Sequence, residues 1–162
     1  MTDPHQIPAA LRSLSLRPLF AMNVAVGTIH APGGPRGTEM RVGDVTGGHF
    51  SGDRLSGIIQ PGGTDWQTLR DDGTILLDAR IVLQTEDGAS IAMQYEGIRR
   101  GHPEVMARLA AGEPVDPADY YFRTMPRFTT AAPRYRWLND ILAVGTGHRL
   151  PHGPVYQIFE IL

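Results

Sequence analysis

The sequence predicts an all-β protein, an antiparallel β-barrel of about 8 to 10 strands with one short helix. Glycine-rich turn signals recur roughly every 10 to 15 residues, and the segments between them alternate apolar and polar residues with a period of two. Hydrophobic residues make up 41% of the 162 residues, enough for one core. Because many strands in a short chain must hide their edges, a closed barrel is favoured, with a β-sandwich as the alternative.

The chain is expected to form a single barrel domain over residues 1–162, in which residues 1–15 are a loosely ordered N-terminal extension. The turn signals PGGPRG, TGG and PGG lie at 32–37, 46–48 and 61–63. Between them we expect the first strands, at 16–30, 38–46 and 53–60.

A β-hairpin is the clearest element of the sequence. Residues 74–85 and 89–98 both alternate with period two, and Asp87-Gly88 lies between them. Asp-Gly accepts the positive φ angles of tight turns, so this pair and Asp72-Gly73 are predicted hairpin tips. On the first strand one face carries only apolar side chains: Ile75, Leu77, Ala79, Ile81 and Leu83.

The one predicted helix runs from Pro103 to Ala111. A proline at its first turn, Glu104 near its amino end and Gly112 after its carboxyl end are helix start and stop signals. The remaining strands are expected at 120–129, 141–147 and 154–162.

Charge and composition exclude several functional classes. The 15 Lys and Arg residues balance 17 Asp and Glu, so no basic field favours nucleic acid or an anionic membrane as a partner. With no cysteine there are no disulfides, thiolate metal sites or thiol nucleophiles. The six histidines lack metal-ligand spacing, and no phosphate loop or dinucleotide fingerprint occurs, so no metal and no cofactor is predicted. Without an apolar run of ~20 residues or a signal peptide, a cytoplasmic protein is expected.

Three blocks of sequence resemble a known family. They are GGTDWQTLRDDGTILLDAR at 62–80, YEG at 95–97 and YYFRTMPRFTTAAPRYRWLN at 120–139. Together they resemble the DUF3237 family, also called UPF0311, over Leu16 to Leu162. The resemblance implies a β-barrel of the general kind seen in allene oxide cyclases and dirigent proteins, with an interior cavity and no established common activity.

Asp65 and Trp66 follow a double glycine that lets the backbone bend, and they form the first candidate pair. One interpretation is a ligand-facing carboxylate beside a stacking ring. The alternative is an aspartate that caps a turn and a tryptophan of the core.

Asp78 and Arg80 share one face of their predicted strand, with side chains ~7 Å apart. If the aliphatic face of that strand packs outward, these two side chains point into the cavity as ligand-binding residues. If the aliphatic face points inward, they are solvent-facing charges.

Tyr95, Arg123 and Asn139 complete the candidate site. A phenol and a guanidinium can bind a carboxylate, an enolate or a phenolate, while the amide can bind a carbonyl group. The alternatives are a cross-strand aromatic pair for Tyr95, a salt bridge for Arg123 and a capping role for Asn139. We expect Asp65, Tyr95 and Arg123 to be catalytic. We also expect six of the candidates to converge on one pocket: Asp65, Trp66, Arg80, Tyr95, Arg123 and Asn139.

Two functions are compatible with such a pocket. The first is a cofactor-independent isomerase, cyclase or lyase that moves protons on a small apolar or aromatic oxygenated compound. The second is a binding or carrier protein for the same class of compound. A homo-oligomer, with a dimer favoured, is expected because an outward aliphatic face would need a covering subunit.

Overall fold

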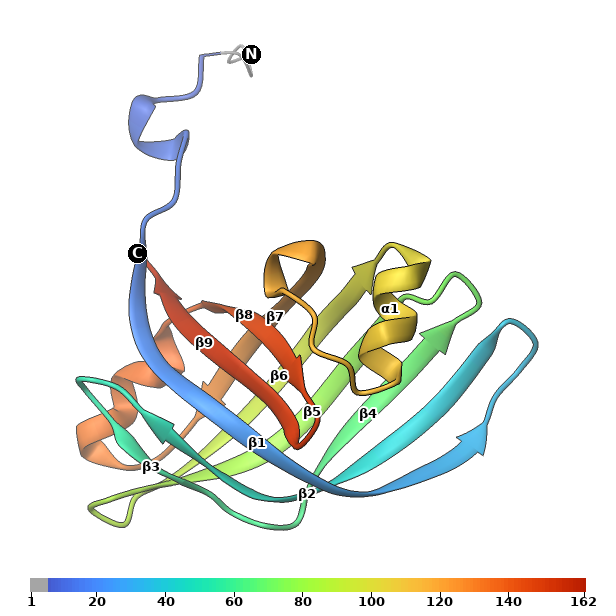
Figure 1. The fold of residues 1–162 in the computed structure, drawn as a ribbon. Helices are drawn as coiled ribbons and strands as arrows, with labels where there is room; N and C mark the ends of the chain where they lie inside the picture. The colour runs from blue at the N-terminus through green and yellow to red at the C-terminus, as the bar shows by residue number, and fades with distance from the viewer. Residues whose placement is uncertain (1–5) are drawn as a thin grey trace.

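The computed structural model describes residues 6–162, which form one closed antiparallel sheet, one α-helix and three 3-10 helices (Figure 1). The strands are β1 (Leu16–Gly33), β2 (Thr38–Ser51), β3 (Ser56–Ile59), β4 (Gly63–Arg70), β5 (Ile75–Thr85), β6 (Ser90–Gly101), β7 (Tyr120–Thr129), β8 (Ala143–Leu150) and β9 (Gly153–Ile161). The helices are η1 (Ala9–Leu11), α1 (Pro103–Ala110), η2 (Pro117–Asp119) and η3 (Pro133–Asp140). The predicted all-β class with one short α-helix is confirmed. The first five residues of the expected N-terminal extension lie outside the described residues.

The sheet closes into a barrel because β1 pairs with β9 on one side and with β2 on the other. The ring continues from β9 through β8, β7, β6 and β5. Both β3 and β4 fill the space between β5 and β2, so strand pairing continues around the whole ring. The barrel, rather than the sandwich, is therefore the observed architecture.

Strand β4 is an element that the sequence analysis missed, because PGG at 61–63 indicated only a turn. The chain kinks at Gly62, whose φ is +104°, and then resumes pairing between β2 and β5. A Cβ atom on Gly63 would lie 2.6 Å from the carbonyl oxygen of Arg80, so a glycine is needed where β4 approaches β5. This crossing places Asp65 on the barrel wall instead of in a loop.

Both predicted Asp-Gly hairpin tips are confirmed. Gly73 joins β4 to β5 with φ +81°, and Gly88 joins β5 to β6 with φ +86°. Each aspartate also stabilises its own turn, since Asp72 accepts a 2.8 Å hydrogen bond from the backbone nitrogen of Thr74 and Asp87 accepts one from the Thr85 hydroxyl.

The interior of the barrel is packed with apolar side chains. The aliphatic face of β5 is buried there, and the facing strands contribute Phe20, Met93, Phe122 and Ile158. Each large apolar side chain gains ~1.5 to 3 kcal/mol from leaving water, so this face of β5 turns inward and the charged face turns outward. The expected reason for self-association, an exposed aliphatic face on β5, is therefore wrong, and self-association itself stays a prediction.

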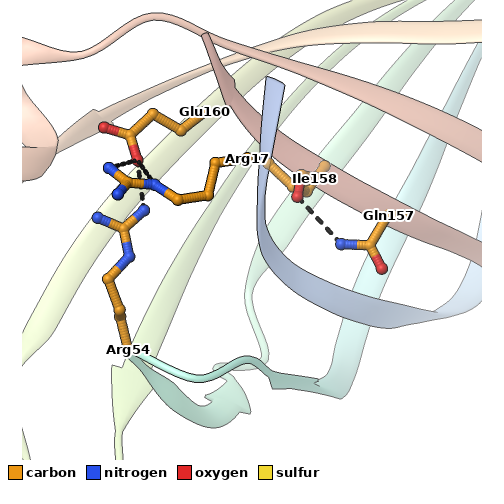
Figure 2. Close-up of polar contacts among 5 residues, drawn as sticks. All are labelled: Arg17, Arg54, Gln157, Ile158 and Glu160. Carbon is orange, nitrogen blue, oxygen red and sulfur yellow. Dashed lines mark hydrogen bonds and ion pairs between the residues drawn. The ribbon is translucent and has the colours of Figure 1, made fainter. Parts of the chain in front are cut away.

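The two ends of the barrel are closed differently. At one end α1 begins at Pro103, directly after β6, and Gly112 ends it with φ +75°. At the other end Arg17 and Arg54 both donate hydrogen bonds to one oxygen of Glu160, with 2.9 Å between Arg17 Nη2 and that oxygen (Figure 2). This cluster fastens β9 to β1 and to the segment between β2 and β3. None of the described helices is both long and apolar enough to cross a membrane.

Candidate functional site

A cavity of about 660 Å³ lies at the end of the barrel beside α1, and we call it the mouth pocket. Its apolar lining comes from both the helix and the strands: Ile75, Leu77, Met106, Leu109 and Phe122. Its polar lining includes Asp65, Gln67, Arg99, Arg149 and Tyr156. Such a combination of an apolar wall and a few convergent polar groups is typical of small-molecule sites.

Asp65 is the buried carboxylate of the mouth pocket, with 3% of its surface exposed. Its Oδ2 accepts a 2.7 Å hydrogen bond from Gln67, which lies two residues along the same inward face of β4. Its Oδ1 is buried and has no hydrogen-bond partner among the described residues. Burial raises the pKa of Asp65 above its ordinary value, against the opposing effects of the Gln67 hydrogen bond and the charges of Arg99 and Arg149.

Two arginines enter the mouth pocket from the strands on either side of β7. Arg99, on β6, is 8% exposed, and its guanidinium lies 5.4 Å from the centre of the Phe122 ring. Its Nε has no hydrogen-bond partner among residues 6–162. Burial, followed by the positive charge of Arg149, lowers the pKa of Arg99. Arg149, on β8, is half-buried, and its backbone nitrogen donates a 2.8 Å hydrogen bond to the hydroxyl of Tyr120.

Aromatic rings form the inner wall of the mouth pocket. The Tyr156 ring lies 5.4 Å from Phe122 and 5.5 Å from Tyr95, measured between ring centres. The Tyr156 hydroxyl is buried and has no hydrogen-bond partner among the described residues. Burial, together with the negative charge of Asp65, raises the pKa of Tyr156, so its phenol stays protonated and can donate.

Two small residues lie next to these groups on the inner face of the wall. Ala79 stands between Asp65 and Tyr95 in the paired register of β4, β5 and β6. Gly147 faces the Phe122 ring so closely that a Cβ atom would lie 2.7 Å from it. Larger side chains at these two inward positions would fill the space beside the carboxylate.

The structure divides the predicted site residues among four places. Asp65 lines the mouth pocket, and Tyr95, 1% exposed, points into the barrel behind Tyr156. A groove of about 780 Å³ on the outer wall contains three others: Trp66, Asp78 and Arg123. A second outer groove contains the last two, Arg80 and Asn139. The predicted convergence on one pocket is therefore not observed.

Strand geometry explains the outward positions. On β5 the aliphatic residues take the interior, so Asp78 and Arg80 face outward. On β7 the buried positions include Phe122 and Thr124, and Arg123 between them points away from the barrel.

Trp66 and Asn139 have local partners on the outside of the barrel. Trp66 is 49% exposed, and its ring nitrogen donates a 3.2 Å hydrogen bond to Thr64. Asn139 accepts from the backbone nitrogen of Thr130 and donates to its carbonyl oxygen, at 2.9 Å and 2.8 Å. These contacts give Asn139 the bridging role of an ordinary structural asparagine.

The functional candidates that the sequence analysis missed are Gln67, Arg99, Arg149 and Tyr156. A signal for Arg99 was present, because the inward alternation of Ile91, Met93 and Tyr95 continues through Gly97 to Arg99. No signal separated Arg149 or Tyr156 from structural residues. Across residues 6–162, no three His, Cys, Asp or Glu side chains gather closely enough to hold a metal ion.

The fold and this site define a small closed β-barrel with a mouth pocket built around one buried carboxylate and two arginines. The chain belongs to the family described as "Protein of unknown function (DUF3237)", whose model matches residues 14–161. The resemblance seen in the sequence is thereby confirmed.

Relatives with known structures share this fold. A UPF0311 protein of Rhodopseudomonas palustris is 35% identical over 150 residues, which cover 93% of this chain and 98% of that protein. Its crystal structure, described as a conserved protein of unknown function, matches with a TM-score of 0.89 over 93% of this chain and 99% of that one. A β-barrel-like protein of Acinetobacter baumannii matches with a TM-score of 0.83 and 34% identity, over 96% of this chain and 100% of that one.

A more distant relative carries the name of an enzyme. The hydroalkoxylation enzyme phnH of Penicillium herquei is 28% identical over 128 residues, which cover 79% of this chain and 70% of that protein.

Proposed function

We propose that the mouth pocket is the active site of a cofactor-independent isomerase, cyclase or lyase that acts on a small apolar or aromatic oxygenated compound. The observation that carries this proposal is Asp65, a carboxylate that is 3% exposed and has one free oxygen facing an apolar-walled pocket. A raised pKa brings the proton affinity of a carboxylate closer to neutral pH, where it can both accept and return a proton.

The other polar groups of the mouth pocket can donate hydrogen bonds to a substrate oxygen on which negative charge develops. Asp65 would take a proton from an O–H or C–H group of the substrate and return it to another atom, which leaves atoms and electrons balanced without an oxidant. Meanwhile the Tyr156 hydroxyl and the Arg99 guanidinium would donate to the oxygen on which negative charge accumulates. They take the place beside Asp65 that the sequence analysis expected Tyr95 and Arg123 to have.

The name of the Penicillium relative supports this class of chemistry. Hydroalkoxylation adds an O–H group across a carbon–carbon double bond, so one proton leaves oxygen and one arrives at carbon. Such a reaction needs a positioned acid or base and a shaped, dry cavity. The mouth pocket offers both.

Deuterium exchange tests proton transfer directly, with 2-tetralone as an enolisable aromatic ketone. The protein in D₂O should accelerate incorporation of deuterium next to the carbonyl above the buffer rate, as measured by NMR. Replacing the base by Asp65→Asn should lower that rate by ~100-fold or more. The matched control Asp140→Asn changes an exposed carboxylate on η3 and should leave the rate unchanged.

Two outcomes would decide against the proposal. Binding of 2-tetralone to the wild-type protein without exchange above the buffer rate would favour the carrier function. Exchange that survives Asp65→Asn would remove Asp65 from the role of acid or base.

A further inference from the structure

Arginines outnumber aspartates in the lining of the mouth pocket: Arg41, Arg70, Arg99 and Arg149 stand against Asp65, Asp71 and Asp72. Asp71 and Asp72 are exposed, whereas Asp65 is buried, and the charges of Arg99 and Arg149 both act to lower the pKa of Asp65. Neither arginine has a carboxylate within 4.0 Å in the part of the chain that the structure describes. At the rim, Arg41 is already paired with Glu39 at 3.0 Å.

Arg99 is the more deeply buried of the two arginines. Arg99 is 8% exposed and has no carboxylate within 4.0 Å among residues 6–162, so Asp65 acts on its charge only from farther away. Its guanidinium has lost water without gaining a direct ion pair, and burial of an unpaired charge is costly. Its contact with the Phe122 ring offsets only part of that cost. Its Nε remains a buried donor with nothing to accept from it within residues 6–162. Such a group is explained most simply by an anionic partner that the chain itself does not supply.

The surroundings of the two arginines indicate the shape of that partner. Arg99 pairs in register with Phe122 across β6 and β7, and Arg149 lies on the next strand, β8. The rings of Phe122 and Tyr156 form an aromatic wall, and α1 adds Met106 and Leu109. An inorganic anion would leave these apolar surfaces empty, whereas a flat aromatic anion would cover them.

We propose that the mouth pocket binds aromatic anions, with a carboxylate or phenolate oxygen held by Arg99 and Arg149 and the aromatic body against Phe122 and Tyr156. This inference rests on the mouth pocket of the proposed function and names its substrate class. The bound anion supplies the direct ion pair that Arg99 lacks, and its apolar part lies against Leu77, Met106 and Leu109.

Calorimetric titration with 2-naphthoate and 2-naphthamide tests the inference, because the two compounds share a shape and differ in charge. The wild-type protein should bind the naphthoate at least 10-fold more tightly than the amide, and inorganic phosphate should not compete. Arg99→Met should weaken naphthoate binding at least 10-fold and leave amide binding nearly unchanged. Arg149→Met, at a half-buried position, gives a second variant if Arg99→Met does not fold.

The matched control is Arg123→Met, which removes an arginine from the outer wall and should leave both affinities unchanged. Equal affinity for the naphthoate and the amide, or no naphthoate binding at all, would overturn the inference. So would an equal loss in the Arg123→Met and Arg99→Met proteins. Since 2-tetralone is neutral, its Asp65-dependent exchange would still be observed if only the anion inference failed.

Discussion

Asp65 connects the stability of the protein with its proposed function. Burial of this carboxylate raises its pKa, as the proposed acid–base role requires, and also makes its charged form costly in free energy. The substitution Asp65→Asn keeps the size of the side chain and an oxygen that can accept from Gln67 at the position where Oδ2 now does. It removes the buried negative charge whose Oδ1 has no partner in the described part of the chain. We therefore expect the variant to be more stable than the wild type at neutral pH and inactive in proton transfer.

The size of the gain follows from the contacts of Asp65. An unsatisfied buried acceptor costs ~1 to 3 kcal/mol, and more when it is charged. The attraction of Arg99 and Arg149 opposes that cost, but the net effect still raises the pKa of Asp65, so burial outweighs the attraction. The amide keeps one imperfectly paired group, which leaves a gain of about 1 kcal/mol in the free energy of unfolding. For a domain of this size that is ~2 to 4 °C in melting temperature.

The pH dependence supplies an independent check. The pKa of Asp65 is higher in the folded state than in the unfolded state. Protonated Asp65 therefore contributes its full stabilisation when the pH is below the unfolded-state pKa. That stabilisation is lost as the pH rises through the folded-state pKa. The advantage of Asp65→Asn should therefore be absent at low pH and grow as the pH rises. Thermal unfolding by circular dichroism at several pH values measures it, with Asp140→Asn as the control. A variant that melts below the wild type at neutral pH, or an advantage that shrinks with rising pH, would refute the reasoning.

Three further predictions concern the rest of the barrel. Glu160→Gln should lower the free energy of unfolding by about 1 to 2 kcal/mol, because a 7% exposed acceptor loses two charge-assisted bonds to partly exposed arginines (Figure 2). Those hydrogen bonds outweigh burial and lower the pKa of Glu160, so the urea-measured difference should vanish as the pH falls through the folded-state value. Gly147→Ala should cost ~1 to 3 kcal/mol and weaken 2-naphthoate binding, since the new Cβ displaces the Phe122 ring; unchanged melting and affinity would contradict this. Self-association should use the outer wall, where Trp66 and Met125 are exposed, so Met125→Arg should reduce the mass seen by light scattering, and a monomeric wild type would contradict it.

Local signals in the sequence were sufficient for most of the fold. The Asp-Gly turns and the period-two segments placed the β5–β6 hairpin, and Pro103 and Gly112 bounded the helix within one residue. Strand β4 was not predicted because its pairing depends on a close approach between Gly63 and the backbone of Arg80. That approach is a long-range contact, which no local pattern contains.

The site was harder to predict because it depends on which face of each strand looks inward. Alternation divides a strand into two faces but does not say which face is inside when both carry plausible residues. For β5 the aliphatic face decided the matter, and the same logic applied along β6 would have selected Arg99. On β7, Arg123 lies in a block that resembles the family and was predicted to be catalytic. The buried positions of that strand belong instead to its neighbours Phe122 and Thr124.

The position of the mouth pocket within the barrel follows from the distribution of apolar and polar inward residues. Toward the Glu160 end, Phe20 packs against Phe50 and Phe128 with ring centres 5.4 Å and 6.0 Å apart, and the interior there is filled. Toward α1 the inward side chains of β4 and β6 include the polar Asp65, Gln67 and Arg99, and the interior opens into the mouth pocket. A closed sheet supports its wall by continuous pairing, so one end can remain hollow while the other end supplies the packed core. The packed core and the mouth pocket thus lie at opposite ends of the same strands, and we expect substitutions at the two ends to be additive in the free energy of unfolding.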